Sequence, residues 1–80
     1  MSLTPAQCRA ARALIDWSRE DLSRHAGVAV RTISDFEAGR RDPINATMTS
    51  MRSALEAAGV EFIPENGGGS GVRFKRKSDH

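Results

Sequence analysis

The sequence predicts a mainly α-helical bundle of four to five helices that ends in a short β-strand or hairpin. Helix-forming stretches separated by capping residues and glycines fill residues 4–59, whereas glycine and β-branched residues dominate residues 60–77. The chain has 80 residues, which is enough for one core but not for two. We therefore divide it into a helical part at residues 1–59, a strand or hairpin at residues 60–77 and a disordered tail at residues 78–80.

The first helix is predicted to begin after Thr4, a favourable N-cap residue, with Pro5 at its first position. Cys8, Ala11 and Ile15 follow at spacings of three and four residues, so they share one face of the helix. This face is apolar and is expected to point into the core.

The second helix is predicted to begin at Ser18, which forms a capping-box pattern with Asp21. Leu22 and Ala26 are expected to face the core. Gly27 is a natural C-terminal stop, so the helix is only about eight residues long.

The third helix is predicted over residues 30–38, with Ile33 and Phe36 as its buried anchors and Gly39 as its end.

A fourth helix is predicted to start at Asn45, which we expect to be its N-cap. Its apolar face carries Met48, Met51 and Leu55 at spacings of three and four residues, and Gly59 ends it. The alternating residues 60–63 then predict a strand, and residues 71–75 predict a returning one.

The composition excludes several classes of protein. The single cysteine cannot form an internal disulfide, and no cluster of cysteine and histidine has the spacing of metal ligands. No apolar run approaches the ~18 residues of a membrane span, and the N-terminus lacks the pattern of a signal peptide. No nucleophile–histidine arrangement, paired acidic site or phosphate-binding loop occurs. We expect a cytoplasmic protein that is not an enzyme and uses no metal, cofactor, small-molecule ligand or membrane.

The second and third predicted helices carry the signature of a helix-turn-helix, which joins two short helices through a tight turn that contains glycine. Ala26 is small where the two helices approach each other, and Gly27 supplies the turn geometry. The pattern therefore points to binding of double-stranded DNA in the major groove.

Two runs of sequence resemble the Xre family of lambda/Cro-repressor-like helix-turn-helix regulators. They are WSREDLSRHAGV at residues 17–28 and TISDFEAGRR at residues 32–41, and the resemblance extends over about residues 5–58. The C-terminal GVEFIPENGGG and GVRF also resemble small members of this family from alphaproteobacteria. The resemblance implies a lambda-repressor-like bundle and a sequence-specific transcriptional regulator, located in the cytoplasm and associated with the nucleoid.

The resemblance also implies a role for individual residues. Arg12 and Glu37 match two residues that commonly form an internal ion pair, although two independent surface charges are the simpler interpretation. The positions that match DNA base contacts are Arg19, Val30, Arg31 and Asp35. The positions expected to contact the DNA backbone are Ser18, Thr32, Ser34, Arg40, Arg41, Asn45 and Thr47.

The side chains at the base-contact positions suit this role. Arg31 can donate two hydrogen bonds to guanine, or it can serve only as a phosphate clamp. Asp35 can accept a hydrogen bond from cytosine, orient Arg31 or Arg19, or simply be solvated. Val30 offers an apolar contact to a thymine methyl group.

The end of the chain leaves further alternatives open. Arg73, Lys75, Arg76 and Lys77 form a basic run, which can bind phosphate or can instead serve solubility and guard a strand edge. Because the core is thin and lacks a disulfide or metal, we expect a homodimer with a palindromic operator, joined through the C-terminal strand region with the fourth helix as a further candidate contact. The alternative function is that of an antitoxin-like or adaptor protein that uses the same fold to bind a protein.

Overall fold

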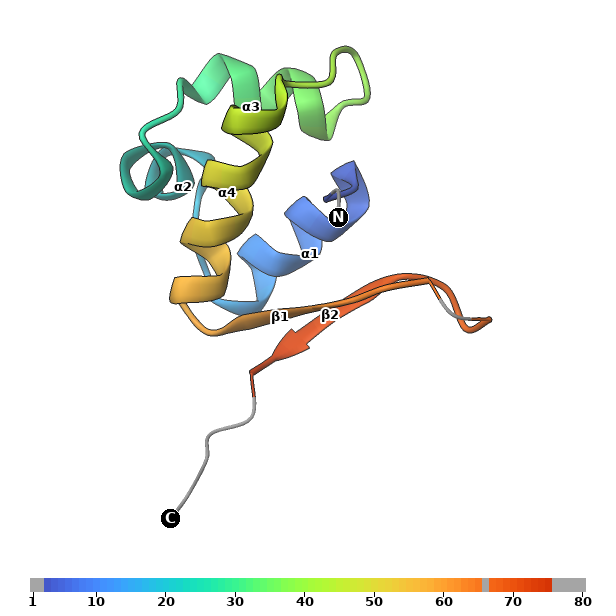
Figure 1. Cartoon of the computed structure of the whole chain (residues 1–80). Coiled ribbons are helices and arrows are strands. Elements are labelled where there is room, and N and C mark those ends of the chain that lie inside the picture. The colour runs from blue at the N-terminus through green and yellow to red at the C-terminus, as the bar shows by residue number, and fades with distance from the viewer. Residues whose placement is uncertain (1–2, 66, 76–80) are drawn as a thin grey trace.

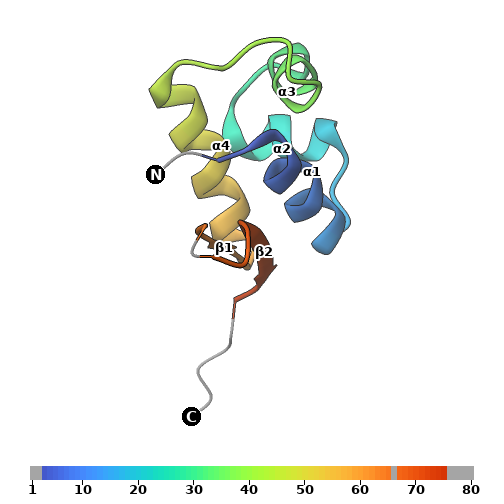
Figure 2. The same cartoon turned by 90° about the vertical axis from the view of Figure 1, so that its right-hand side faces the viewer.

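The computed structural model describes residues 3–65 and 67–75 of the chain. The elements are, in order, α1 (Pro5–Leu14), α2 (Arg19–Ala26), α3 (Val30–Glu37), α4 (Asn45–Ala57), β1 (Val60–Ile63) and β2 (Gly71–Phe74). The helices form a bundle, and the antiparallel hairpin of β1 and β2 runs beneath it (Figure 1). Both views place α3 and the hairpin at opposite ends of the molecule (Figures 1 and 2). The predicted fold class is confirmed.

The first two helices begin at the predicted capping residues. The hydroxyl of Thr4 accepts the backbone N–H of Gln7, and the Gln7 side chain accepts the N–H of Thr4 in return. Ser18 and Asp21 form the same reciprocal pair at the start of α2. These boxes satisfy N–H groups that a helix start otherwise leaves unpaired, so local sequence alone fixes both starts.

The prediction for the start of α4 is wrong. Ile44 is the N-cap residue of α4, and Asn45 is already the first helical residue. No side chain caps this helix, and none caps α3 behind Ala29. Ile44 has the extended backbone of an N-cap, with ψ 160°, and its carbonyl accepts the N–H of Met48 at 3.0 Å, so the first helical hydrogen bond begins one residue before Asn45.

One core joins the helices to the first strand. Its buried members are Leu3, Cys8, Ala11, Leu22, Ile33, Phe36, Met51, Leu55, Val60 and Phe62. All four helices contribute side chains to it, and β1 contributes two. No helix in the described part of the chain is long and apolar enough to cross a membrane.

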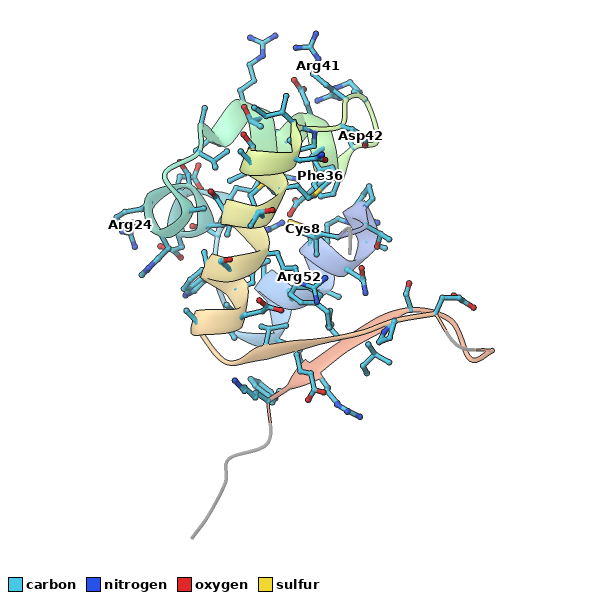
Figure 3. All side chains as sticks on the ribbon, in the orientation of Figure 1. Cys8, Arg24, Phe36, Arg41, Asp42 and Arg52 are labelled. Carbon is cyan, nitrogen blue, oxygen red and sulfur yellow. The ribbon has the colours of Figure 1, made fainter. Side chains whose placement is uncertain are left out.

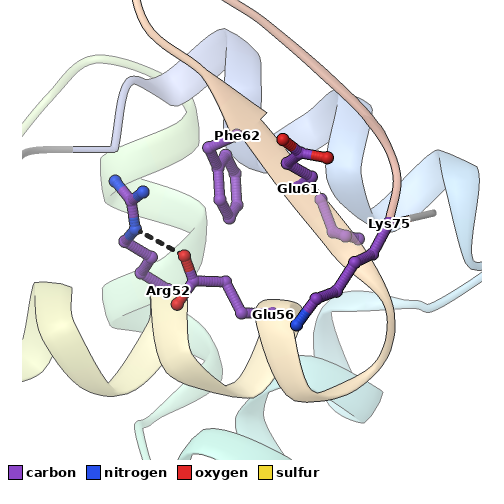
Figure 4. A pocket seen from close by; sticks show the side chains of 6 residues that line it. Arg52, Glu56, Glu61, Phe62 and Lys75 are labelled. Carbon is purple, nitrogen blue, oxygen red and sulfur yellow. Dashed lines mark hydrogen bonds and ion pairs between the residues drawn. The ribbon is translucent and has the colours of Figure 1, made fainter. Parts of the chain in front are cut away.

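The hairpin is held to the helices by polar contacts as well as by burial. The side-chain amide of Gln7 donates to the carbonyl oxygen of Gly71 at 3.0 Å and to that of Ile63 at 3.4 Å. The guanidinium of Arg52 on α4 lies 4.9 Å from the ring centre of Phe62, beside a hollow of about 330 Å³ (Figure 4). Both α1 and α4 therefore fix the position of the hairpin.

We expect Ile33→Ala to destabilise the protein by about 2–5 kcal/mol, because Ile33 is fully buried at the centre of the core. A chain of this size has a stability of roughly 3–5 kcal/mol, so the variant should be largely unfolded at 25 °C. Urea titration followed by circular dichroism measures the loss. Ile44→Ala is the matched control, since Ile44 is 73% exposed. A similar loss in both variants would contradict the packing described here.

Candidate nucleic-acid interface

The turn between α2 and α3 sets the direction of α3. Gly27 adopts the left-handed conformation, with φ 69°. This conformation is unfavourable for any residue that has a β-carbon. Its N–H donates to the carbonyl of Ser23 at 2.9 Å, and the Ser23 hydroxyl donates to the carbonyl of Val28. The chain therefore leaves α2 through a tight turn, and α3 begins at Val30, three residues after Gly27.

The burial of α3 divides its residues into an inner and an outer set. Ile33, Phe36 and Glu37 are buried. Arg31 is exposed, and the remaining predicted contact residues of the helix are partly buried, namely Val30, Thr32, Ser34 and Asp35. Two anchors three residues apart fix the helix rotation, so the outer face is available to a ligand.

A shallow cleft lies between α3 and the loop that leads to α4. It has a volume of about 260 Å³ and is lined by Ala29, Arg31, Thr32, Asp35, Arg41 and Pro43. The structure thus brings together four of the predicted DNA-contact residues from two segments of chain. Figure 3 shows Arg41 at this end of the molecule and Arg24 on α2, well away from it.

The last residue of α3, Glu37, is an anion buried in the protein. Its side chain has no exposed surface. Arg12 donates Nε to Oε2 and Nη2 to Oε1, both at 2.8 Å. Arg19 donates Nε to Oε1 at 3.0 Å, and the thiol of Cys8 donates to Oε2 at 3.0 Å. The carboxylate therefore connects α1 and the start of α2 to the end of α3.

These contacts determine the protonation of the cluster. Burial raises the pKa of Glu37, but the hydrogen bonds from Arg12, Cys8 and Arg19 outweigh it, and the net pKa lies below the ordinary value. Burial and the hydrogen bond to Glu37 strongly raise the pKa of the Cys8 thiol. The thiol therefore stays protonated and acts as a hydrogen-bond donor, not as a nucleophile.

Arg19 lies at the edge of this cluster. Its side chain is 44% exposed, yet its Nε is committed to the buried carboxylate of Glu37. The sequence placed Arg19 among the residues that face DNA. The structure adds that one side of the guanidinium is already held by the protein.

Asp35, the acidic residue of the outer face, has a different partner from those considered in the sequence. Its Oδ1 accepts a hydrogen bond from Nε of Arg40 at 3.2 Å and lies 3.1 Å from Nη2 of Arg40 in an ion pair. Asp35 is therefore bound neither to Arg31 nor to Arg19. Across residues 3–65 and 67–75, no carboxylate pairs with Arg31 or Arg41.

The family model for helix-turn-helix proteins of the Cro/C1 type, which are Xre-like, matches residues 9–59. The chain belongs to this family. It is therefore a DNA-binding helix-turn-helix regulator, from a family of transcription regulators and not of enzymes. A comparison with curated proteins found no match.

The remaining predicted contact residues of this helix-turn-helix protein lie outside the cleft. Ser18 caps α2, where its hydroxyl accepts the N–H of Asp21 at 3.0 Å. Asn45 and Thr47 lie in the first turn of α4, which no side chain caps. In the basic run near the C-terminus, Arg73 pairs with Glu61 at 3.1 Å, while residues 76 and 77 lie outside the described part of the chain.

The sequence analysis missed the role of Cys8, which it treated only as a small apolar residue of the first helix. The signal was its spacing from Arg12, because residues four apart on a helix share a face. Arg12 and Cys8 both reach the carboxylate of Glu37 from that face of α1. Arg9 was also missed, and its Nη1 donates to the backbone carbonyl of Glu37.

We expect Glu37→Gln to destabilise the protein by about 3–5 kcal/mol. The side chain of Arg12 is only 16% exposed, and the substitution removes the negative charge that compensates its guanidinium. Since the folded pKa of Glu37 lies below its ordinary value of 4.5, the carboxylate stabilises the fold fully above pH 4.5. That contribution is lost as the pH falls through the lowered folded pKa.

Urea titrations of the wild type at a series of pH values between 7 and 3 measure the fall in the free energy of unfolding at low pH. The same titrations of Glu37→Gln, at each pH where it is folded, give the part of this free energy that Glu37 contributes. Glu61→Gln is the matched control, since Glu61 pairs with Arg73 at the surface and its loss should change stability little. An equal effect of the two substitutions at pH 7 would show that Glu37 does not hold the bundle together.

Proposed function

We propose that this regulator binds a palindromic operator as a homodimer and reads each half-site in the major groove through α3. The observation that carries the proposal is Arg31, which is exposed on α3 and pairs with no carboxylate in the described part of the chain. A guanidinium in that state can offer two parallel N–H groups to O6 and N7 of guanine. The proposal therefore includes a guanine at the matching position of each half-site.

The other contacts follow from the position of α3 in the groove. Val30 and the outer nitrogens of Arg19 reach base edges beside Arg31. The backbone contacts come from hydroxyl, amide and guanidinium groups around α3 and the start of α4, namely Ser18, Thr32, Ser34, Arg40, Arg41, Asn45 and Thr47. Backbone contacts of this kind fix the register of the protein on DNA but carry no sequence information.

The hairpin supports the dimer part of the proposal. The sheet within the described residues has only two strands, so each strand keeps an unpaired edge. Phe74 on β2 is 59% exposed, although its partner across the hairpin, Val60, is buried in the core. We propose that a second copy of the chain covers this region, at the end of the molecule opposite α3.

Selection of bound duplexes from random DNA tests the reading of bases. We expect the wild type to enrich two inverted half-sites whose centres are about one helical turn apart. Arg31→Ala should lose the preference at one base pair of each half-site, at a cost of roughly 1–3 kcal/mol of discrimination.

Arg41→Ala is the control, because it removes the same charge from the same cleft at a position proposed to contact phosphate. It should weaken binding to all sequences about equally. Unchanged preference in Arg31→Ala would contradict the base-reading role. If the wild type enriched no sequence at all, the adaptor function considered above would be favoured.

Sedimentation equilibrium tests the dimer. We expect the wild type to be dimeric at tens of micromolar, and Phe74→Glu to be monomeric, because a charge at the contact would be buried without a partner. Ile44→Glu, the matched change at the other large exposed apolar residue, should stay dimeric. A monomeric wild type, or equal effects of both substitutions, would contradict the proposed surface.

A further inference from the structure

Asp35 presents a problem for DNA binding, because it places a carboxylate on the side of α3 that is proposed to face the phosphates. A negative charge there weakens binding unless it reads a base or is balanced by a cation. The side chain of Asp35 is 26% exposed, and it lines the cleft beside Arg31 and Arg41. The contacts of Asp35 decide between these two roles.

The side chain and the backbone carbonyl of Asp35 both contact the start of the loop after α3. Its Oδ1 accepts a hydrogen bond from Nε of Arg40 at 3.2 Å and lies 3.1 Å from Nη2 of the same guanidinium. Its backbone carbonyl accepts the N–H of Arg40 at 2.8 Å and the N–H of Arg41 at 3.4 Å. One residue of α3 thus fixes both the backbone of the loop and the side chain of its first arginine.

The geometry also limits what Arg40 can do. Its Nε and Nη2 share one oxygen of Asp35, so one side of the guanidinium faces the protein. The side chain is 65% exposed, which leaves its outer side free for a ligand. This state suits a single contact to a phosphate better than the two parallel hydrogen bonds that guanine offers.

We propose that Asp35 is a positioning residue that neutralises and orients Arg40 at the DNA backbone, and that it does not read a base. The inference rests on the proposed DNA-binding function and refines it. Arg31 then reads sequence, Arg41 adds an unpaired positive charge, and the Asp35–Arg40 pair contributes orientation with almost no net charge. Loss of Arg40 is harmful mainly because it exposes the carboxylate of Asp35 to the phosphates.

A double-mutant cycle tests this coupling on the selected operator. Arg40→Ala should weaken binding about tenfold, because a phosphate contact is lost and a carboxylate is left uncompensated. Asp35→Asn keeps the size of the side chain and removes its charge. By itself it should change affinity less than about threefold and leave the base preferences unchanged, and in the Arg40→Ala background it should restore most of the lost affinity.

Arg41→Ala provides the matched control, since Arg41 is the next residue but has no ion pair with Asp35. Asp35→Asn should not rescue Arg41→Ala. Circular dichroism of each variant shows that the helices are intact, and the slope of binding against salt concentration reports the change in effective charge.

Three results would overturn the inference. In the first, Asp35→Asn removes a preference at one base pair of each half-site, as a base-reading residue would. In the second, it fails to rescue Arg40→Ala. In the third, it rescues Arg41→Ala equally, which would indicate a general effect of charge. The same cycle measured on random-sequence duplex at low salt tests the coupling even if no operator exists, so failure of the inference and failure of the proposed function are distinguishable.

Discussion

The arrangement of the helices depends on one buried charge, the carboxylate of Glu37. It ends α3 and receives hydrogen bonds from Arg12 and Cys8 on α1 and from Arg19 at the start of α2. An ion without such donors would be too costly to bury, so the three elements must come together in one geometry for the carboxylate to be satisfied. Ile33 and Phe36 already set the rotation of α3 by apolar packing, and the donors to Glu37 add a directional constraint at the end of the helix. The outer face of α3 is therefore presented in a fixed direction because of a contact on its inner side.

A second carboxylate, that of Asp35, lies two residues earlier on the same helix and faces outward. Together the two acids determine which arginines around α3 are held in ion pairs and which are not. Glu37 holds Arg12 and Arg19 on the protein side, and Asp35 holds Arg40 at the loop. Arg31 and Arg41 are left with no carboxylate partner in the described residues. The formal net charge of +2 is thus a poor guide to DNA binding, because the position of each acid decides which cations face outward.

The sequence predicted the features that depend on neighbouring residues. Thr4 and Ser18 cap their helices through residues three positions away, and Gly27 ends α2 through its own backbone conformation. The start of α4 was misplaced by one residue, because Asn45 is a good capping residue by type, whereas the cap is made by the backbone of Ile44 and involves no side chain. The spacing of Cys8 and Arg12 places them on one face of α1, but it does not indicate that Glu37, 29 positions after Cys8, lies against that face. Only the fold brings such residues together, so the resemblance supplied the pair of Arg12 with Glu37 but not the rest of the cluster.

The hairpin completes the core of this 80-residue chain at the end opposite the outer face of α3, the proposed DNA-binding surface. Val60 and Phe62 complete the core from the end opposite α3, and Gln7 ties both strands to α1 through carbonyl groups. The helices therefore gain apolar burial from a segment that does not line the cleft of Arg31. Because the exposed Phe74 also lies on the hairpin, association of two chains there would leave both α3 helices uncovered. If α3 reads sequence and the hairpin joins two chains, as proposed, this separation lets the two roles change independently, apart from the stability that both share through one core.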